Sequence, residues 1–79
     1  MTQLELVCKV PARGTQNYEL LYAFQRGEVL TVAEALTRYG IYALSQRVGE
    51  LKRMGWPIVA EPYETGGGAR VARYRMQRD

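Results

Sequence analysis

The amino-acid sequence predicts a small α+β domain in which three short helices precede a C-terminal β-hairpin. Apolar residues recur at helical spacing in three successive segments between residues 15 and 55, and capping or glycine signals bound each segment. Two strand-like runs then flank the glycine-rich stretch Gly66-Gly67-Gly68. A further strand is predicted at the N-terminus. A chain of 79 residues forms one domain with a small core.

Composition places the chain among ordinary globular proteins and excludes several kinds of site. Hydrophobic residues make up 47% of the chain and charged residues 24%. With no histidine and one cysteine, Cys8, the chain offers neither an internal disulfide nor a Cys/His metal site. We expect no metal and no cofactor. The N-terminus does not resemble a signal peptide, and no apolar run approaches the roughly 20 residues of a membrane span. We therefore expect a cytoplasmic protein without a membrane partner.

Positive charge is concentrated in the second half of the chain. Residues 1–37 hold three basic and four acidic residues, whereas residues 38–79 hold eight basic and four acidic residues, which accounts for the net charge of +3. A basic C-terminal half is typical of a nucleic-acid-binding surface. A solvated basic face without a ligand is the alternative.

The N-terminal residues 1–14 are predicted to form a strand extension ahead of the main domain. Residues 3–10 alternate, with Leu4, Leu6, Cys8 and Val10 on one side. Pro11 and Gly14 then break the strand. On this reading Cys8 is a buried and inert thiol.

The first helix is predicted over residues 16–26. Thr15 can cap its start, and Gly27 ends it. Leu20, Leu21 and Phe24 mark its apolar side. This helix serves packing.

The second helix begins with a capping box, because Thr31 and Glu34 have the spacing at which each side chain accepts from the other's backbone N–H. It runs to about residue 38 or 39, with Val32, Ala35 and Leu36 directed inward. Gly40 can then adopt the left-handed conformation that lets the chain turn sharply.

The third helix is predicted to begin near Tyr42 or Ala43 and to end at Gly55. Leu44, Val48 and Leu51 form its buried face. The opposite face is polar and basic, and consists of Tyr42, Ser45, Gln46, Gly49, Lys52 and Arg53. A mid-helix glycine costs about 0.8–1 kcal/mol relative to alanine. Gly49 therefore indicates that a large partner approaches the backbone there, with a tolerated surface glycine as the alternative.

The C-terminal hairpin is predicted from strands over residues 58–61 and 69–77, joined by a flexible tip over residues 62–68. In the second strand Ala72, Tyr74 and Met76 share a face opposite Arg73 and Arg75. The glycine run is not a phosphate-binding P-loop, because no Gly-Lys-Ser/Thr follows it. The main domain then spans residues 15–77, and residues 78–79 form a frayed end.

Taken together, these elements resemble a winged helix-turn-helix domain, especially the short ones found in phage and prophage genes, and more distantly the DNA-binding part of biotin repressor proteins. The likeness covers about residues 15–77. It is carried by the segments 30–36, 39–41 and 44–55, by Ile58 and by residues 74–76. One departure is the short turn, in which three residues separate Gly40 from Leu44. Either the turn is tight or the second helix runs through Gly40.

The resemblance implies that the third helix enters the major groove of double-stranded DNA and that the hairpin acts as a wing on the phosphate backbone. The residues it assigns to DNA are Tyr42, Ser45, Gln46, Gly49, Lys52 and Arg53 on the helix and Arg70, Arg73 and Arg75 on the wing. Gln46 could pair with adenine, and Lys52 or Arg53 with guanine or phosphate. Arg47 is expected in a structural salt bridge, with a phosphate contact as the alternative.

We therefore expect a sequence-specific DNA-binding protein that acts as a phage or prophage transcription regulator. An excisionase-like architectural factor is a close alternative. A winged helix used as a protein-binding module is a further one, because the chain has six tyrosines and only a modest net charge. A homodimer is also a possible state of the protein. No set of nucleophile, base and orienting group supports an enzyme.

Overall fold

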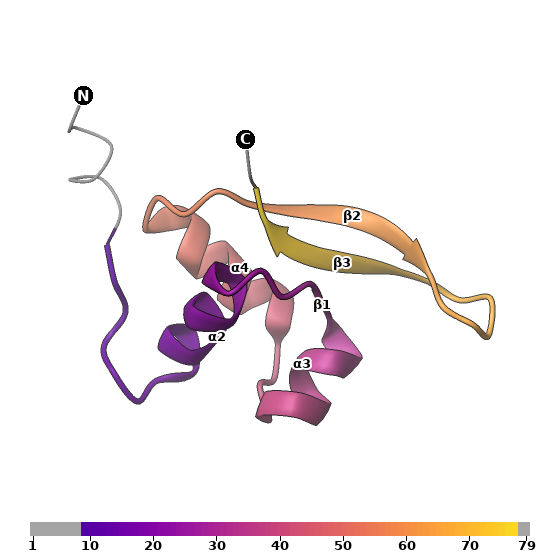
Figure 1. The fold of residues 1–79 in the computed structure, drawn as a ribbon, viewed down its shortest axis with the longest axis horizontal. Helices are drawn as coiled ribbons and strands as arrows, with labels where there is room; N and C mark the ends of the chain where they lie inside the picture. Colours follow the sequence, from indigo (N-terminus) through magenta and orange to yellow (C-terminus); the bar gives the residue numbers. More distant parts are fainter. Residues whose placement is uncertain (1–8, 78–79) are drawn as a thin grey trace.

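The computed structural model describes residues 9–77 and contains three helices and a three-stranded antiparallel sheet. The helices pack together beneath the sheet, and the β2–β3 hairpin projects beyond them as a long wing (Figure 1). The element order is α2 (Gln16–Gln25), β1 (Leu30–Thr31), α3 (Val32–Tyr39), α4 (Leu44–Arg53), β2 (Ile58–Glu64) and β3 (Arg70–Met76). The predicted α+β winged layout is confirmed.

Side-chain caps begin the first two helices. Thr15 Oγ1 accepts a hydrogen bond from the Tyr18 N–H at the start of α2. At the start of α3, Thr31 Oγ1 accepts from the Glu34 N–H at 3.2 Å, and the Glu34 carboxylate accepts from the Thr31 N–H at 3.0 Å. Both caps were predicted, since they depend only on residues within one helical turn.

The turn between α3 and α4 is tight because two of its residues are left-handed. Gly40 caps α3 at φ 66°, and Ala43 precedes α4 at φ 55° and ψ 54°. A residue in this conformation cannot continue a right-handed helix. The prediction that the third helix begins near Tyr42 or Ala43 was therefore wrong, and α4 begins at Leu44.

The core lies where the three helices meet the sheet. Phe24, Leu20 and Leu51 are fully buried, and Ile41, in the tight turn, is 1% exposed. The buried face predicted for the third helix is confirmed. The complete set of buried apolar residues is Leu20, Leu21, Ala23, Phe24, Leu30, Ala35, Ile41, Leu44, Val48, Leu51 and Ile58.

Two of the three residues predicted to face inward from α3 are exposed instead. Ala35 is buried, but Val32 is 51% and Leu36 43% exposed. The reason is geometric: α3 has only eight residues, and its packing face is defined by Ala35 and the partly buried Tyr39. Helix α3 thus presents apolar side chains to solvent.

The sheet has the strand order β1-β3-β2. Strand β1 was predicted only as an extended link, but it pairs with β3 through Leu30 opposite Tyr74 and Thr31 opposite Arg73. These partners are far apart in sequence, so no local pattern could indicate the pairing. Strand β1 thus joins β3 of the wing to the helices.

The wing is longer and its tip tighter than predicted. Residues Pro62, Tyr63 and Glu64 were assigned to a flexible tip, but they extend β2 and pair with β3. Hydrogen bonds from Gly68 N–H to Thr65 O and from Thr65 N–H to Ala69 O close the turn, with Gly68 at φ 90°. A left-handed glycine in this position is typical of a three-residue hairpin loop.

The segment ahead of α2 does not form a strand in the residues described. Lys9 and Val10, the last two residues of the predicted N-terminal strand, lie outside the sheet. Instead, Lys9 N–H donates to Met54 O at the end of α4. The remainder of that prediction, including Cys8, and the predicted frayed residues 78–79 lie outside the described residues.

Candidate nucleic-acid interface

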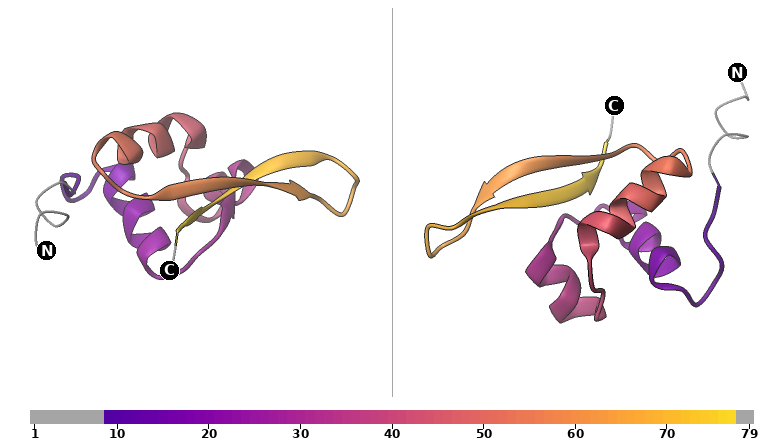
Figure 2. Two further views of the ribbon diagram at one scale, coloured as in Figure 1. Left: turned by 90° about the horizontal axis from the view of Figure 1, so that it is seen from above. Right: turned by 180° about the vertical axis from the view of Figure 1, so that it is seen from behind.

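Helix α4 presents one polar side to solvent, and no other element covers it in the view from behind (right panel of Figure 2). Ser45, Gln46, Lys52 and Arg53 are exposed, and Gly49 is half-buried. At about 100° per residue these five positions share an arc of about 120°, opposite Leu44, Val48 and Leu51. The structure thus brings together the five predicted site residues that lie within α4.

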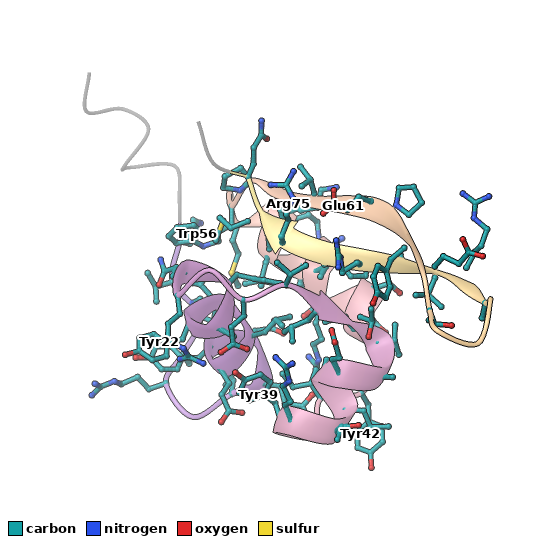
Figure 3. All side chains as sticks on the ribbon, turned by 45° about the vertical axis from the view of Figure 1, so that its right-hand side comes forward. Tyr22, Tyr39, Tyr42, Trp56, Glu61 and Arg75 are labelled. Carbon is teal, nitrogen blue, oxygen red and sulfur yellow. The ribbon has the colours of Figure 1, made fainter. Side chains whose placement is uncertain are left out.

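Tyr42 lies outside α4, in the turn that precedes it. Its side chain is 69% exposed and points away from the molecule near the lower end of α3 (Figure 3). Because Ala43 is left-handed, Tyr42 does not follow the helical phase of the other candidate residues. Its place beside the N-terminal end of α4 comes from the turn.

Gly49 leaves open space beside the backbone of α4. A Cβ atom built at this position meets only the Arg53 Nη1 atom, at 3.8 Å. Since that separation is an ordinary van der Waals contact, nothing within the described residues requires a glycine here. The internal packing of the protein therefore does not explain this residue.

Two of the three predicted wing arginines are engaged by one carboxylate. On the outer face of the sheet, Arg75 Nε donates to Glu61 Oε2 at 3.0 Å, and Arg73 Nη2 lies 4.0 Å from the same oxygen. The Arg73 guanidinium also stacks 4.3 Å from the ring centroid of Tyr63. Both arginines are therefore held against the sheet and partly neutralised.

Arg70 lies on the other face of the wing. Register places it opposite Glu64, and residues 70, 72, 74 and 76 share the side on which Tyr74 and Met76 pack against the core. Arg70 is exposed and makes no ion pair with residues 9–77. The wing thus divides the three predicted arginines between its two faces.

A second carboxylate fixes α4 against α2. Glu50 Oε1 accepts a hydrogen bond of 2.7 Å from Asn17 Nδ2 and one of 3.5 Å from Arg47 Nη1. The bond from Asn17 and then the charges of Arg47 and Arg53 hold the pKa of Glu50 below its ordinary value. Arg47 thus forms the predicted structural salt bridge, which links it to the packed side of α4.

A third carboxylate joins the end of α2 to α3. The Tyr39 hydroxyl donates to Glu28 at 2.6 Å, Arg26 Nη2 donates to Glu28 at 2.6 Å, and Arg38 Nη1 lies 3.6 Å away. The hydrogen bonds from Tyr39 and Arg26 hold the pKa of Glu28 below its ordinary value and Glu28 raises the pKa of Tyr39. This cluster ties α3 to the end of α2.

Sequence reasoning missed Glu61 and Tyr63 as partners of the wing arginines. The sequence did contain a signal for these contacts. Glu61 and Tyr63 lie two residues apart on one strand, and Arg73 and Arg75 lie two residues apart on the other, so each pair shares one face of its strand. It becomes a set of contacts only once the register pairs Glu61 with Arg73 and Tyr63 with Val71. A hairpin of unknown tip length does not supply that register.

The sequence profile of the winged helix-turn-helix domain matches residues 15–79. The chain therefore belongs to the winged helix-turn-helix domain family, a class that indicates DNA binding and is typically non-enzymatic. Comparison with curated proteins and with solved structures gives no significant match. Within the described residues, the helices are too short and too polar to span a bilayer.

Proposed function

We propose that this protein binds double-stranded DNA in a sequence-specific manner, with α4 in the major groove and the wing on the phosphate backbone. The proposal rests mainly on the uncovered side of α4, where Gln46 shares one face with the two cations Lys52 and Arg53, about two turns further along the helix. Gln46 can offer a donor and an acceptor to adenine. Lys52 and Arg53 make no ion pair with residues 9–77, so their charge is available to phosphates.

The narrower proposal is a transcription regulator of a phage or prophage. The resemblance of segments 30–36 and 44–55 to short phage helix-turn-helix proteins supports it. An excisionase-like factor uses the same fold to bend DNA. A bending assay separates the two, because a regulator that reads base edges need not change the path of the duplex, whereas an architectural factor must.

The test of DNA binding is a titration of the full chain into a labelled random duplex at about 50 and 200 mM salt, followed by selection of bound sequences. Lys52→Glu with Arg53→Glu should weaken binding at least about tenfold and flatten its salt dependence. Gln46→Ala should relax the selected sequence at one position, since a bidentate base contact is worth about 1–3 kcal/mol of discrimination.

Arg13→Glu is the control for each single substitution, Lys52→Glu or Arg53→Glu, because Arg13 is exposed and precedes α2, outside both α4 and the wing. It should change affinity far less than either α4 substitution. If the wild-type chain binds no duplex even at low salt, the proposal is wrong.

A second candidate function is favoured by the exposed apolar side chains of α3 and of the turn that follows it. Val32, Leu36 and Tyr42 are 51%, 43% and 69% exposed, and exposed apolar side chains of this kind occur where proteins dock. A protein-binding module predicts that Lys52→Glu and Arg53→Glu leave function intact. The same variants therefore decide between the two candidates.

A further inference from the structure

Positive charges without carboxylate partners gather at the C-terminal end of α4. Arg26, Arg38, Arg47, Arg73 and Arg75 each lie within 4.0 Å of a carboxylate. Five cations among residues 9–77 have no such partner, and three of them, Lys9, Lys52 and Arg53, belong to the last turn of α4 or are attached to its end. The other two are Arg13, ahead of α2, and Arg70, on the wing. The cations that remain available to a polyanion are therefore unevenly distributed.

Lys9 belongs to this end of the helix because its backbone is bound there. Its N–H donates to Met54 O at 2.9 Å, and its carbonyl accepts from Trp56 Nε1 at 2.6 Å. Trp56 lies beside the segment that leads into α2 (Figure 3). Two residues later Pro11 is buried. The backbone of Lys9 is thus held at α4 while its side chain is exposed.

This attachment is additional to the family's domain, whose match begins at residue 15. It also satisfies the carbonyl of Met54, which directly follows the last residue of α4 and has no partner within the helix. Ordering a free arm would cost about 1–2 kcal/mol per residue when DNA binds. For Lys9, this ordering is already complete in the folded protein.

We propose that Lys9 is a further phosphate-contacting residue, which lies ahead of the winged-helix domain and adds a third DNA contact beside those of α4 and the wing. This inference rests on the proposed DNA binding. The backbone attachment brings Lys9 to the end of α4 that carries Lys52 and Arg53, and a phosphate backbone there would offset these like charges. Neutralising one more phosphate steepens the salt dependence of binding by about 0.9 in the slope of log K against log salt.

The experiment compares full-length wild type with Lys9→Gln by fluorescence anisotropy on a labelled random duplex. Lys9→Gln should reduce the slope by about 0.9, so that its affinity deficit relative to wild type shrinks about 3.5-fold between about 50 and 200 mM salt. Arg13→Gln is the control within the same segment, with the same change of charge. Arg13 lies just ahead of α2, so the Arg13→Gln variant should retain the wild-type slope.

Trp56→Phe tests the attachment itself, since it removes the indole N–H that holds the Lys9 carbonyl and keeps an aromatic ring. It should weaken binding in the same direction as Lys9→Gln. Combining the two substitutions should reduce the slope no further than Lys9→Gln alone. Circular dichroism confirms that each variant is folded.

The outcomes separate this inference from the function on which it rests. A wild-type chain that binds no duplex at low salt overturns both. A wild-type chain that binds, with an unchanged slope for Lys9→Gln, overturns the role of Lys9 alone. In that case Lys9 serves only the end of α4, where a cation interacts favourably with the last carbonyl groups, and its replacement lowers stability without altering the salt dependence.

Discussion

Glu61 and Arg75 are diagonal neighbours on the two strands of the wing, and Arg75 Nε donates to Glu61 Oε2 at 3.0 Å (Figure 3). The same carboxylate lies 4.0 Å from Arg73. On the proposed function, this one acidic side chain would compete with phosphate for two of the arginines that the family resemblance assigns to DNA. Glu61 is therefore expected to limit the affinity of the wing.

Glu61→Gln should tighten DNA binding and steepen its salt dependence, because it frees Arg73 and Arg75 for phosphate. The slope should increase by about 0.9 for each arginine that gains a contact. Stability should change by less than about 1 kcal/mol, since partly exposed ion pairs contribute little. Glu19→Gln makes the same change of net charge on α2. If both variants bind alike, the two wing arginines do not reach the phosphates.

Gly49→Ala should stabilise the protein and weaken its binding to DNA. The added methyl group meets only Arg53 Nη1 at 3.8 Å, so the helix gains about 0.8–1 kcal/mol. Thermal unfolding should show an increase in Tm of about 4–8 °C. A loss of affinity in anisotropy titrations would follow from close approach of DNA to the backbone. Unchanged affinity would identify Gly49 as a tolerated surface glycine.

Ala43→Gly should stabilise the helix-turn-helix turn. Ala43 is left-handed at φ 55°, a conformation that costs a residue with a Cβ about 1–2 kcal/mol. Glycine removes this strain, but it also loses more conformational entropy on folding, which cancels part of the gain in stability. We expect a net gain of about 0.5–1 kcal/mol in urea unfolding. Ala43→Val provides the opposite test, because a β-branched side chain fits this region worst. A stabilising valine would contradict the observed backbone conformation.

Tyr39→Phe should reduce the loss of stability in acid. The Tyr39 hydroxyl is the largest cause of the lowered pKa of Glu28, followed by Arg26. A carboxyl with a lowered folded pKa contributes stability above its unfolded pKa, near 4.5, and this contribution disappears as the pH falls through the folded value. Urea unfolding measured from neutral pH down into the acid range should give a shallower profile for the variant. Tyr22→Phe removes an exposed hydroxyl from α2 and should retain the wild-type profile.

Much of the helical part of the fold could be predicted because its signals are local. The caps at Thr15 and Thr31 and the buried row Leu44, Val48 and Leu51 depend on residues no more than four positions apart. The exposed arc of α4 followed directly from the buried row. The start of α4 was misplaced because alanine usually favours a right-handed helix, so the residue type at position 43 gave no sign of a left-handed backbone.

The amino-acid sequence by itself thus determined the three helices, the two wing strands and the polar face of α4, since helical spacing and strand alternation express short-range geometry. Tertiary structure alone decided the pairing of β1 with β3, the contact of Glu61 with Arg73 and Arg75, and the attachment of Lys9 to Met54. Each of these joins residues distant in the chain, and such contacts depend on strand register and on the packing of whole elements, which no short segment encodes.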